Sequence, residues 1–448
     1  MAARIGFTGV CLAYFAIILD ASVLNVAVPA IRSGLGASMA GAQWVLNAYT
    51  LTLAALLLSA GALGDRTGLR RSLLAGTTLF TLASAACAVA PGTGVLVGAR
   101  IVQGVGAAAL LPATLALVPH LFPAGTARAR ATVVWVGTGA VATAVGPLVG
   151  GVLIDAVGWR AIFAVNLPVG VATVLLVRAG VAETPRVSRR IGWYGPVSAA
   201  ATLGLLTGGL IEAGQHGWTA PTTLALLAGA VVAGAAFRVA ATRGAHPMLP
   251  PGFFALRVRA AAVGSAGLMG FLFYGVLFLM SLYFQQARGW SPSRAGVALL
   301  PLTIGSTVGP LVLYRPLAAR AGHRVMLLAG FLGCTAGVAV LATAGPYPVL
   351  AVGLLLVGLS STMVFSALTS LLIGNVPAAQ SGLASGLQNT LRQSGALIAV
   401  AVLGSLLNAA SLASRYPAAC TVLVAAAVVA VTVATGALRT HDAPAGPG

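Results

Sequence analysis

Charge is scarce in this sequence. Of its 448 residues 25 are basic and 6 acidic, so charged residues make up 7%, against about 25% in a typical soluble domain. A soluble protein could not cover its surface with so few charges, and a disordered chain needs high charge with low hydrophobicity. Because 59% of the residues are hydrophobic, the composition indicates an integral membrane protein.

Lysine is absent and cysteine is rare. The 25 basic residues are all Arg, which gives a net charge of +19. Cytoplasmic loops of membrane proteins collect Arg, so we expect a lipid bilayer and no nucleic acid as partner. We expect neither a disulfide framework nor a metal site, because the four Cys lie in apolar stretches without a CxxC motif. The GxxxxGK[ST] motif is also missing, which disfavours ATP as the driving force, and we expect no cofactor.

Long apolar stretches are abundant. A membrane-spanning helix needs about 20 apolar residues, and fourteen stretches qualify. These runs are too long and unbroken for barrel strands, which alternate over about 10 residues. The sequence therefore predicts an all-α integral membrane protein with fourteen transmembrane helices, at residues 6–30, 42–64, 72–90, 94–118, 132–154, 161–179, 194–213, 222–240, 259–284, 295–315, 325–344, 347–373, 390–410 and 418–438.

The distribution of Arg predicts how these spans are oriented. With the N-terminus in the cytoplasm, nineteen Arg fall in cytoplasmic segments, and Arg392 is counted among them. Arg100 is the exception, because it lies inside the fourth stretch. Cytoplasmic segments carry the excess of Arg, so both termini are expected in the cytoplasm. The five Arg in external segments are Arg32, Arg160, Arg288, Arg294 and Arg415.

An internal repeat divides the chain. The sequence LGDRTGLR at 63–70 returns as LAARAGHR at 317–324, so that Leu, Arg, Gly and Arg recur 254 residues apart. Repeated halves are typical of secondary transporters, with the substrate site between them. We therefore expect a six-helix half at 1–180, a central loop with two additional helices at 181–258, and a second six-helix half with a short tail at 259–448.

The loop GALGDRTGLRR at 61–71 resembles the signature loop of the major facilitator superfamily. Its glycines allow a tight turn, and its acid can pair with Arg or lie at a helix N-terminus. The resemblance implies a latch between the two halves on the cytoplasmic side; the alternative is a basic loop that only sets topology. The residues concerned are Gly61, Asp65, Arg66, Gly68 and Arg70.

Further segments narrow the resemblance to the fourteen-span drug:proton antiporter family of this superfamily. They are ILDASVLNVAVP at 18–29, LVGARIVQGVGAA at 96–108, GTGAVATAVGPLVGG at 137–151, WRAIFAVNLPVG at 159–170 and QQARGWSPSRAGVALLP at 285–301. The resemblance implies the major facilitator fold in a 6+2+6 arrangement. It also implies export of an amphipathic drug or antibiotic in exchange for protons, as the halves rock around a central site.

Two charged residues are candidates for proton coupling. Asp20 lies in the middle of the first stretch, where an acid costs about 3 kcal/mol on insertion scales. Burial in a low dielectric favours the protonated form of a carboxylate, and the resemblance implies that Asp20 carries the proton. Arg100 keeps its charge and is expected to tune Asp20 by charge and hydrogen bonds. The alternatives are an acid that only solvates a cavity and an Arg that only ties helices together.

Small residues form two lines on the fifth stretch. Gly139, Gly146 and Gly150 belong to one line, and Pro147 and Gly151 to the other. Small faces let helices approach closely in lipid. Ordinary packing explains part of the pattern, and the resemblance adds that this packing seals the resting state against leak.

An amphipathic ligand needs an apolar wall with a few polar groups. Polar residues in the second and fourth stretches and aromatic residues in the ninth could form one, although such stripes are more often simple packing. The candidate pocket residues are Gln43, Asn47, Gln103, Phe271, Tyr274 and Phe278.

The sequence thus predicts a secondary active transporter in the cytoplasmic membrane that acts as a monomer. An alternative is a proton-coupled transporter of an endogenous metabolite. A membrane enzyme or receptor is disfavoured, because the predicted spans contain no His and no sizeable soluble domain exists. No acid occurs between Glu212 and Asp442, which disfavours polyvalent cations and favours neutral or weakly charged amphiphiles.

Overall fold

The computed structural model describes residues 2–122, 125–186, 194–243, 253, 257–309, 314–376, 381–408 and 412–439. In these ranges the regular structure is helical and contains no strand, as expected where lipid cannot satisfy backbone polar groups. The helices are α1 (Ala2–Leu35), α2 (Met39–Thr67), α3 (Leu69–Ala88), α4 (Thr93–Leu121), α5 (Gly125–Val157), α6 (Ala161–Ala164), α7 (Asn166–Gly180), α8 (Tyr194–His216), α9 (Pro221–Arg243), α10 (Arg257–Leu282), η1 (Tyr283–Ala287), α11 (Pro292–Ala298), α12 (Leu300–Val308), α13 (Arg315–Ala342), α14 (Tyr347–Gly374), α15 (Ser381–Asn408) and α16 (Leu412–Arg439).

Many of these helices are long and apolar enough to cross a membrane. Eleven described helices qualify, and the bent α2 would be a twelfth. The predicted span 72–90 coincides with α3, and the predicted span 295–315 overlaps α11 and α12. These three helices are not among the helices that are long and apolar enough to cross a membrane. The all-helical, multi-pass fold is confirmed, and the count of fourteen spans stays a prediction.

The helices pack as two groups, which we call the N-half (α1–α7) and the C-half (α10–α16). In the N-half α1 packs on α5 and α7, and α4 packs on α2 and α3; in the C-half α10 packs on α15, and α13 on α14 and α16. Glycines allow these close crossings, since a Cβ at Gly106 would lie 2.7 Å from the backbone nitrogen of Phe80. The halves meet where α2 packs on α15 and α5 on α11 and α12.

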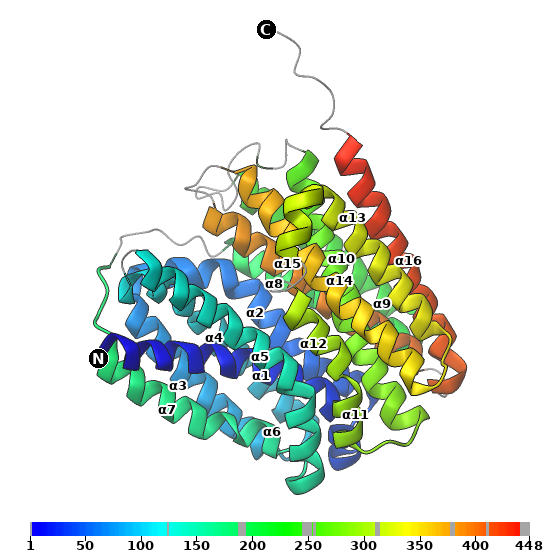
Figure 1. Cartoon of the computed structure of the whole chain (residues 1–448). Helices are drawn as coiled ribbons and strands as arrows, with labels where there is room; N and C mark the ends of the chain where they lie inside the picture. The colour runs from blue at the N-terminus through cyan, green and yellow to red at the C-terminus, as the bar shows by residue number, and fades with distance from the viewer. Residues whose placement is uncertain are drawn as a thin grey trace, which may run out of the picture.

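The halves converge at one end and diverge at the other (Figure 1). We call the end where α1 finishes and α11 begins the joined end. The splayed end is where α1 begins and α16 finishes, at the left and the top of Figure 1.

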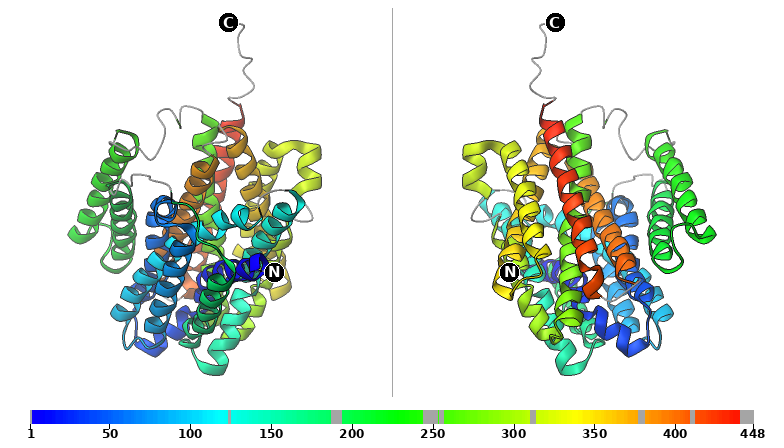
Figure 2. Two further views of the ribbon diagram at one scale, coloured as in Figure 1. Left: turned by 90° about the vertical axis from the view of Figure 1, so that its left-hand side faces the viewer. Right: turned by 90° about the vertical axis from the view of Figure 1, so that its right-hand side faces the viewer.

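Helices α8 and α9 form a pair at the side of the bundle (Figure 2). Helix α8 packs on both α2 and α15, so it covers the line along which the halves meet. The Ser405 hydroxyl of α15 donates a hydrogen bond to the Leu210 carbonyl of α8 at 2.5 Å. Helix α9 contacts mainly α8 and is largely exposed, as suits a helix that faces lipid.

The repeated loops share an unusual backbone conformation. Gly68, between α2 and α3, has φ +99°, and Gly322, in the equivalent position of α13, has φ +77°. Side chains with a Cβ rarely adopt such values. The shared glycine of the sequence repeat therefore marks the same turn in both halves.

Candidate functional site

An ion pair lies inside the N-half. Asp20 of α1 and Arg100 of α4 are 4% and 1% exposed, and a nitrogen of the Arg100 guanidinium lies 2.5 Å from Asp20 Oδ2. A charge buried to this degree needs a partner of opposite sign. The structure thus brings the two predicted coupling residues into direct contact.

Neutral donors complete the surroundings of the carboxylate. The side-chain amides of Gln103 and Asn166 each donate to Asp20 Oδ1 at 2.9 Å. Gln103 also donates to the hydroxyl of Ser84 at 2.8 Å. We call Asp20, Ser84, Arg100, Gln103 and Asn166 the Asp20 network. It joins helices α1, α3, α4 and α7 around one negative charge, and a fully satisfied buried network of this kind is rigid.

Arg100 has further contacts on its other side. Its Nε donates to the Val45 carbonyl of α2 at 3.2 Å, and its guanidinium lies 4.3 Å from the centre of the Tyr49 ring. An aromatic face stabilises a desolvated cation by an amount comparable to a hydrogen bond. Protonation of Asp20 would therefore leave Arg100 charged and still held to α2, while its contact with α1 weakens.

The loop at 61–71 is held to the segment that follows α7. The Thr184 hydroxyl oxygen accepts a hydrogen bond from the Leu69 backbone nitrogen at 2.8 Å, and Glu183 pairs with Arg71 at 3.1 Å. Arg70 donates to the Arg178 carbonyl at 3.3 Å. Gly61 and Asp65 lie in the last part of α2, with Arg66 exposed beside them. All of these contacts lie within the N-half or the segment directly after it.

The two lines of small residues on α5 face different neighbours. A Cβ at Gly139, Gly146 or Gly150 would overlap or crowd side chains of α1. In contrast, Gly151 lies against the Pro292 carbonyl oxygen of α11, and the Pro147 carbonyl oxygen lies against Gly296. One line therefore packs α5 inside the N-half, and the other packs it against the C-half.

Hydrogen bonds between the halves gather at the joined end. Gln43 of α2 donates to the Val400 and Ala401 carbonyls of α15 at 2.9 Å. The Ser293 backbone nitrogen of α11 donates to Asp155 of α5 at 2.9 Å. Further bonds join α1 to α10 and η1 and α5 to α12, through Ser281, Gln285, Thr303 and Thr307.

The predicted pocket residues are spread over several environments. Gln43 bridges the halves, Gln103 belongs to the Asp20 network, and Phe278 is fully buried in the core. Asn47 is buried, and its amide nitrogen has no hydrogen-bond partner among the described residues. Phe271 and Tyr274 are half-buried, which leaves part of each ring available to a ligand.

Arg392 was counted with the Arg of cytoplasmic segments, although the predicted span 390–410 includes it. It lies within α15, inside the apolar segment Ala384–Leu407. A single charge does not interrupt a long apolar helix. The position of Arg392 on the cytoplasmic side and the start of the span at 390 stay predictions.

The sequence matches the family model of the Major Facilitator Superfamily over residues 10–400. The chain belongs to this superfamily. It is 37% identical over 402 residues to the multidrug resistance protein Stp of Mycobacterium tuberculosis, a match that covers 89% of this chain and 74% of that protein. It is also 35% identical to the tetracenomycin C resistance and export protein of Streptomyces glaucescens, with 87% of this chain and 73% of that protein covered.

Solved structures support the fold of this major facilitator transporter. The crystal structure of a peptide transporter, POT, in complex with sulfate superimposes with a TM-score of 0.71 at 15% sequence identity, over 97% of this chain and 95% of that one. At such identity the likeness concerns the fold alone. The family match and the named relatives, together with this fold, make the chain a multi-pass membrane transporter and not an enzyme.

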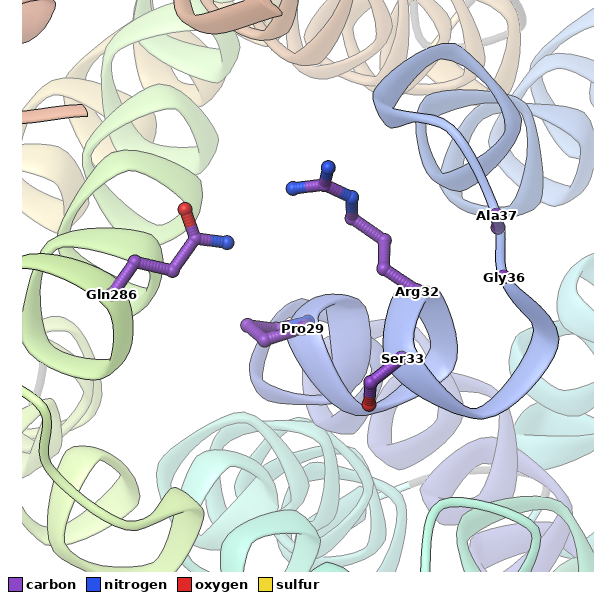
Figure 3. A pocket seen from close by; sticks show the side chains of 6 residues that line it. All are labelled: Pro29, Arg32, Ser33, Gly36, Ala37 and Gln286. Atoms are coloured by element: carbon purple, nitrogen blue, oxygen red, sulfur yellow. The ribbon is translucent and has the colours of Figure 1, made fainter. Parts of the chain in front are cut away.

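This major facilitator transporter also has a cavity between its halves at the joined end. It has a volume of about 370 Å³ and is lined by Pro29, Arg32, Ser33, Gly36, Ala37 and Gln286. Arg32 and Gln286 extend into it from opposite sides (Figure 3). It lies outside the contacts that close the joined end, so it belongs to the surface of that end and not to the centre of the bundle.

Three members of the site were missed by reasoning from sequence. Asn166 donates to Asp20 and the Tyr49 ring faces Arg100, while Ser84 accepts from Gln103 and so contacts the pair through it. Asn166 could have been selected from the sequence, because it lies in the segment 159–170 that resembles the antiporter family. Ser84 and Tyr49 carried none, since Ser and Tyr are common in apolar helices and only helix packing selects these two.

Proposed function

We propose that this chain is a proton-coupled antiporter of the fourteen-span drug-efflux family, which exports amphipathic drugs or antibiotics across the cytoplasmic membrane. The names of its relatives support drug or antibiotic export, and the buried Asp20 supports proton coupling. The chain acts as a monomer with both termini in the cytoplasm, an orientation that the distribution of Arg supports.

The observation that carries the coupling is the composition of the Asp20 network. Asp20 is the buried acid of the described helices, and its partners are one fixed cation and two amides. A carboxylate in such a site holds α1 to α4 and α7 when it is ionised. Protonation removes the attraction to Arg100 and loosens α1, so that proton binding changes how the N-half packs.

The arrangement of the halves fits uptake of substrate for export. With the splayed end in the cytoplasm, the joined end closes the transporter toward the outside. Gln43 and Asp155 then belong to the external seal. The loop at 61–71 contacts Thr184, Glu183 and Arg178 on its own side through Leu69, Arg71 and Arg70. It forms its latch to the C-half when the halves rock and the cytoplasmic end closes.

Transport in liposomes tests the coupling. The full chain is reconstituted, and uptake of a fluorescent neutral amphiphile, pyrenebutyric acid methyl ester, is followed with and without an imposed pH gradient. Asp20→Asn should abolish accumulation driven by the gradient while it retains exchange of the probe between the two sides, because the carrier of the proton is lost but the pathway is intact.

Glu212→Gln is the matched control, since Glu212 lies at the end of α8 and bonds only to His216 and Thr222 among its described neighbours. This variant should accumulate the probe like the unaltered chain. Accumulation by Asp20→Asn at the normal rate would refute proton coupling through Asp20.

A further inference from the structure

A second cation lies inside the membrane-spanning part of the chain without an acid beside it. Arg392 of α15 donates through Nε and Nη2 to the Asn389 side-chain oxygen, at 3.2 and 2.9 Å, and through Nη1 to the Tyr274 hydroxyl at 3.0 Å. Its guanidinium also faces the rings of Tyr274 and Phe365, at 5.8 and 5.6 Å from their centres. In the described part of the chain, its polar partners are therefore neutral.

The C-half contains no acidic side chain that could pair with Arg392. No acid occurs in the sequence between Glu212 and Asp442, and Asp20 already pairs with Arg100. A cation inside a membrane protein is costly unless an opposite charge or water compensates it. Arg100 and Arg392 thus differ: Arg100 is completely buried and paired with an acid, whereas Arg392 is half-buried and its described polar partners are neutral.

The surroundings of Arg392 include aromatic side chains from both halves. Tyr14 of α1 interacts electrostatically with Arg392, and its ring stacks on Trp135 of α5, with the ring centres 4.1 Å apart. The Trp135 indole N–H is buried and has no hydrogen-bond acceptor among the described residues. A cation, an unused N–H donor and several aromatic faces suit a flat apolar molecule with one anionic group.

The backbone beneath Arg392 is held firmly. A Cβ at Gly270 of α10 would overlap the Arg392 carbonyl oxygen, and one at Gly395 would overlap the Gly267 carbonyl oxygen. The two helices therefore cross at van der Waals contact beside Arg392. Asn389 lies one turn earlier on the same face of α15, so it fixes the direction of the guanidinium.

We propose that Arg392 binds an anionic group of the exported compound, with Asn389 and Tyr274 as positioning residues. The substrates are then aromatic amphiphiles that carry one acidic group, such as a carboxylate or an ionised phenol. This inference rests on the proposed function and makes its substrate class more specific.

Binding of three related probes tests the inference. Pyrenebutyric acid, its methyl ester and pyrenebutylamine share one aromatic body and differ in charge at pH 7. Energy transfer from the six Trp to pyrene reports binding to the full chain in lipid nanodiscs. The acid should bind about tenfold more tightly than the ester, the size of one charge-assisted hydrogen-bond pair.

Two variants separate charge from structure. Arg392→Gln should lower affinity for the acid about tenfold and leave the ester unchanged. Asn389→Asp keeps the Arg and supplies an internal carboxylate, so it should weaken binding of the acid and strengthen binding of the amine. Arg238→Gln, on the exposed face of α9, is the matched control and should change neither.

A preference for the acid that survives in both variants would overturn the inference. If Arg392→Gln does not fold, Asn389→Asp alone tests the inference. In that variant, affinities for the acid and the amine that equal those of the unaltered chain would contradict the proposed role of Arg392. Proton coupling is read separately, from accumulation of the probe by Asp20→Asn and by the unaltered chain in liposomes. Accumulation by Asp20→Asn at the normal rate would refute the proposed coupling without changing the binding result, and the two failures are therefore distinguishable.

Discussion

The buried pair of Asp20 and Arg100 makes a quantitative prediction about stability. In Asp20→Asn the charge on Arg100, 1% exposed, loses its counter-charge. It keeps neutral contacts, which are the Gln103 side-chain oxygen at 2.7 Å, the Val45 carbonyl at 3.2 Å and the rings of Tyr49 and Phe163. Removal of one partner from a buried ion pair costs about 3–5 kcal/mol. We expect a loss of this size in the free energy of unfolding, from a chain that still folds at the assay temperature.

Arg100→Gln should cost a similar amount, because it leaves a buried carboxylate with only the two amide donors. The double variant Asp20→Asn/Arg100→Gln removes both charges and leaves neutral amides that can bond to one another. It should lose less than either single variant, since no uncompensated charge remains. The coupling between the two sites is then at least about 3 kcal/mol.

Unfolding by a denaturing detergent measures these four proteins under one condition. Loss of helical circular dichroism gives the midpoint and the free energy of each, and the double-mutant cycle gives the coupling. Additive losses would refute the reasoning, because they would mean that the two charges do not compensate each other in the folded state.

Three further outcomes test the contacts between helices and loops. Gly151→Ala should slow transport in liposomes, because its Cβ would overlap the Pro292 carbonyl oxygen. The control Gly137→Ala has no atom within 4 Å of its Cβ and should match the unaltered chain. Equal rates for the two variants would contradict this packing. In a chain without the four native Cys, cysteines introduced at positions 155 and 293 should cross-link in the absence of substrate, because Asp155 and Ser293 are hydrogen-bonded. A gel shift reports the cross-link. Its absence would contradict a closed joined end. Glu183→Gln should change the unfolding free energy by less than about 1 kcal/mol, because its partner Arg71 is 58% exposed and solvent screens the pair; a larger loss would show a structural role.

Much of the N-half could be predicted from local signals. Asp20 and Arg100 stand out because charges are rare in apolar runs, and an acid and a base in such runs have a strong physical reason to meet. The two lines on α5 could also be read from helical spacing, and the structure assigns one line to α1 and the other to the C-half. These features depend on one helix at a time or on one dominant charge pair.

Features that depend on how helices cross could not be predicted in this way. Gln43 and Phe278 have the composition of pocket residues, but Gln43 lies between α2 and α15, and Phe278 is 0% exposed in the core. Arg392 lies near the start of the predicted span 390–410, where the polar sequence around it resembles the end of a span. Only the contacts with Tyr274 and Phe365 show that it lies inside the C-half.

Composition and periodicity determined that this chain is an all-helical membrane protein, because scarce charge and long apolar runs leave lipid as the only compatible solvent for most of its length. The signature segments pointed to its superfamily, and the rarity of acids pointed to Asp20. The tertiary structure decided which polar groups surround Asp20, which end of the two halves is closed, and that Arg392 lacks a counter-charge. These properties arise from contacts between residues that are far apart in the sequence, and short-range patterns carry no information about which helices will cross.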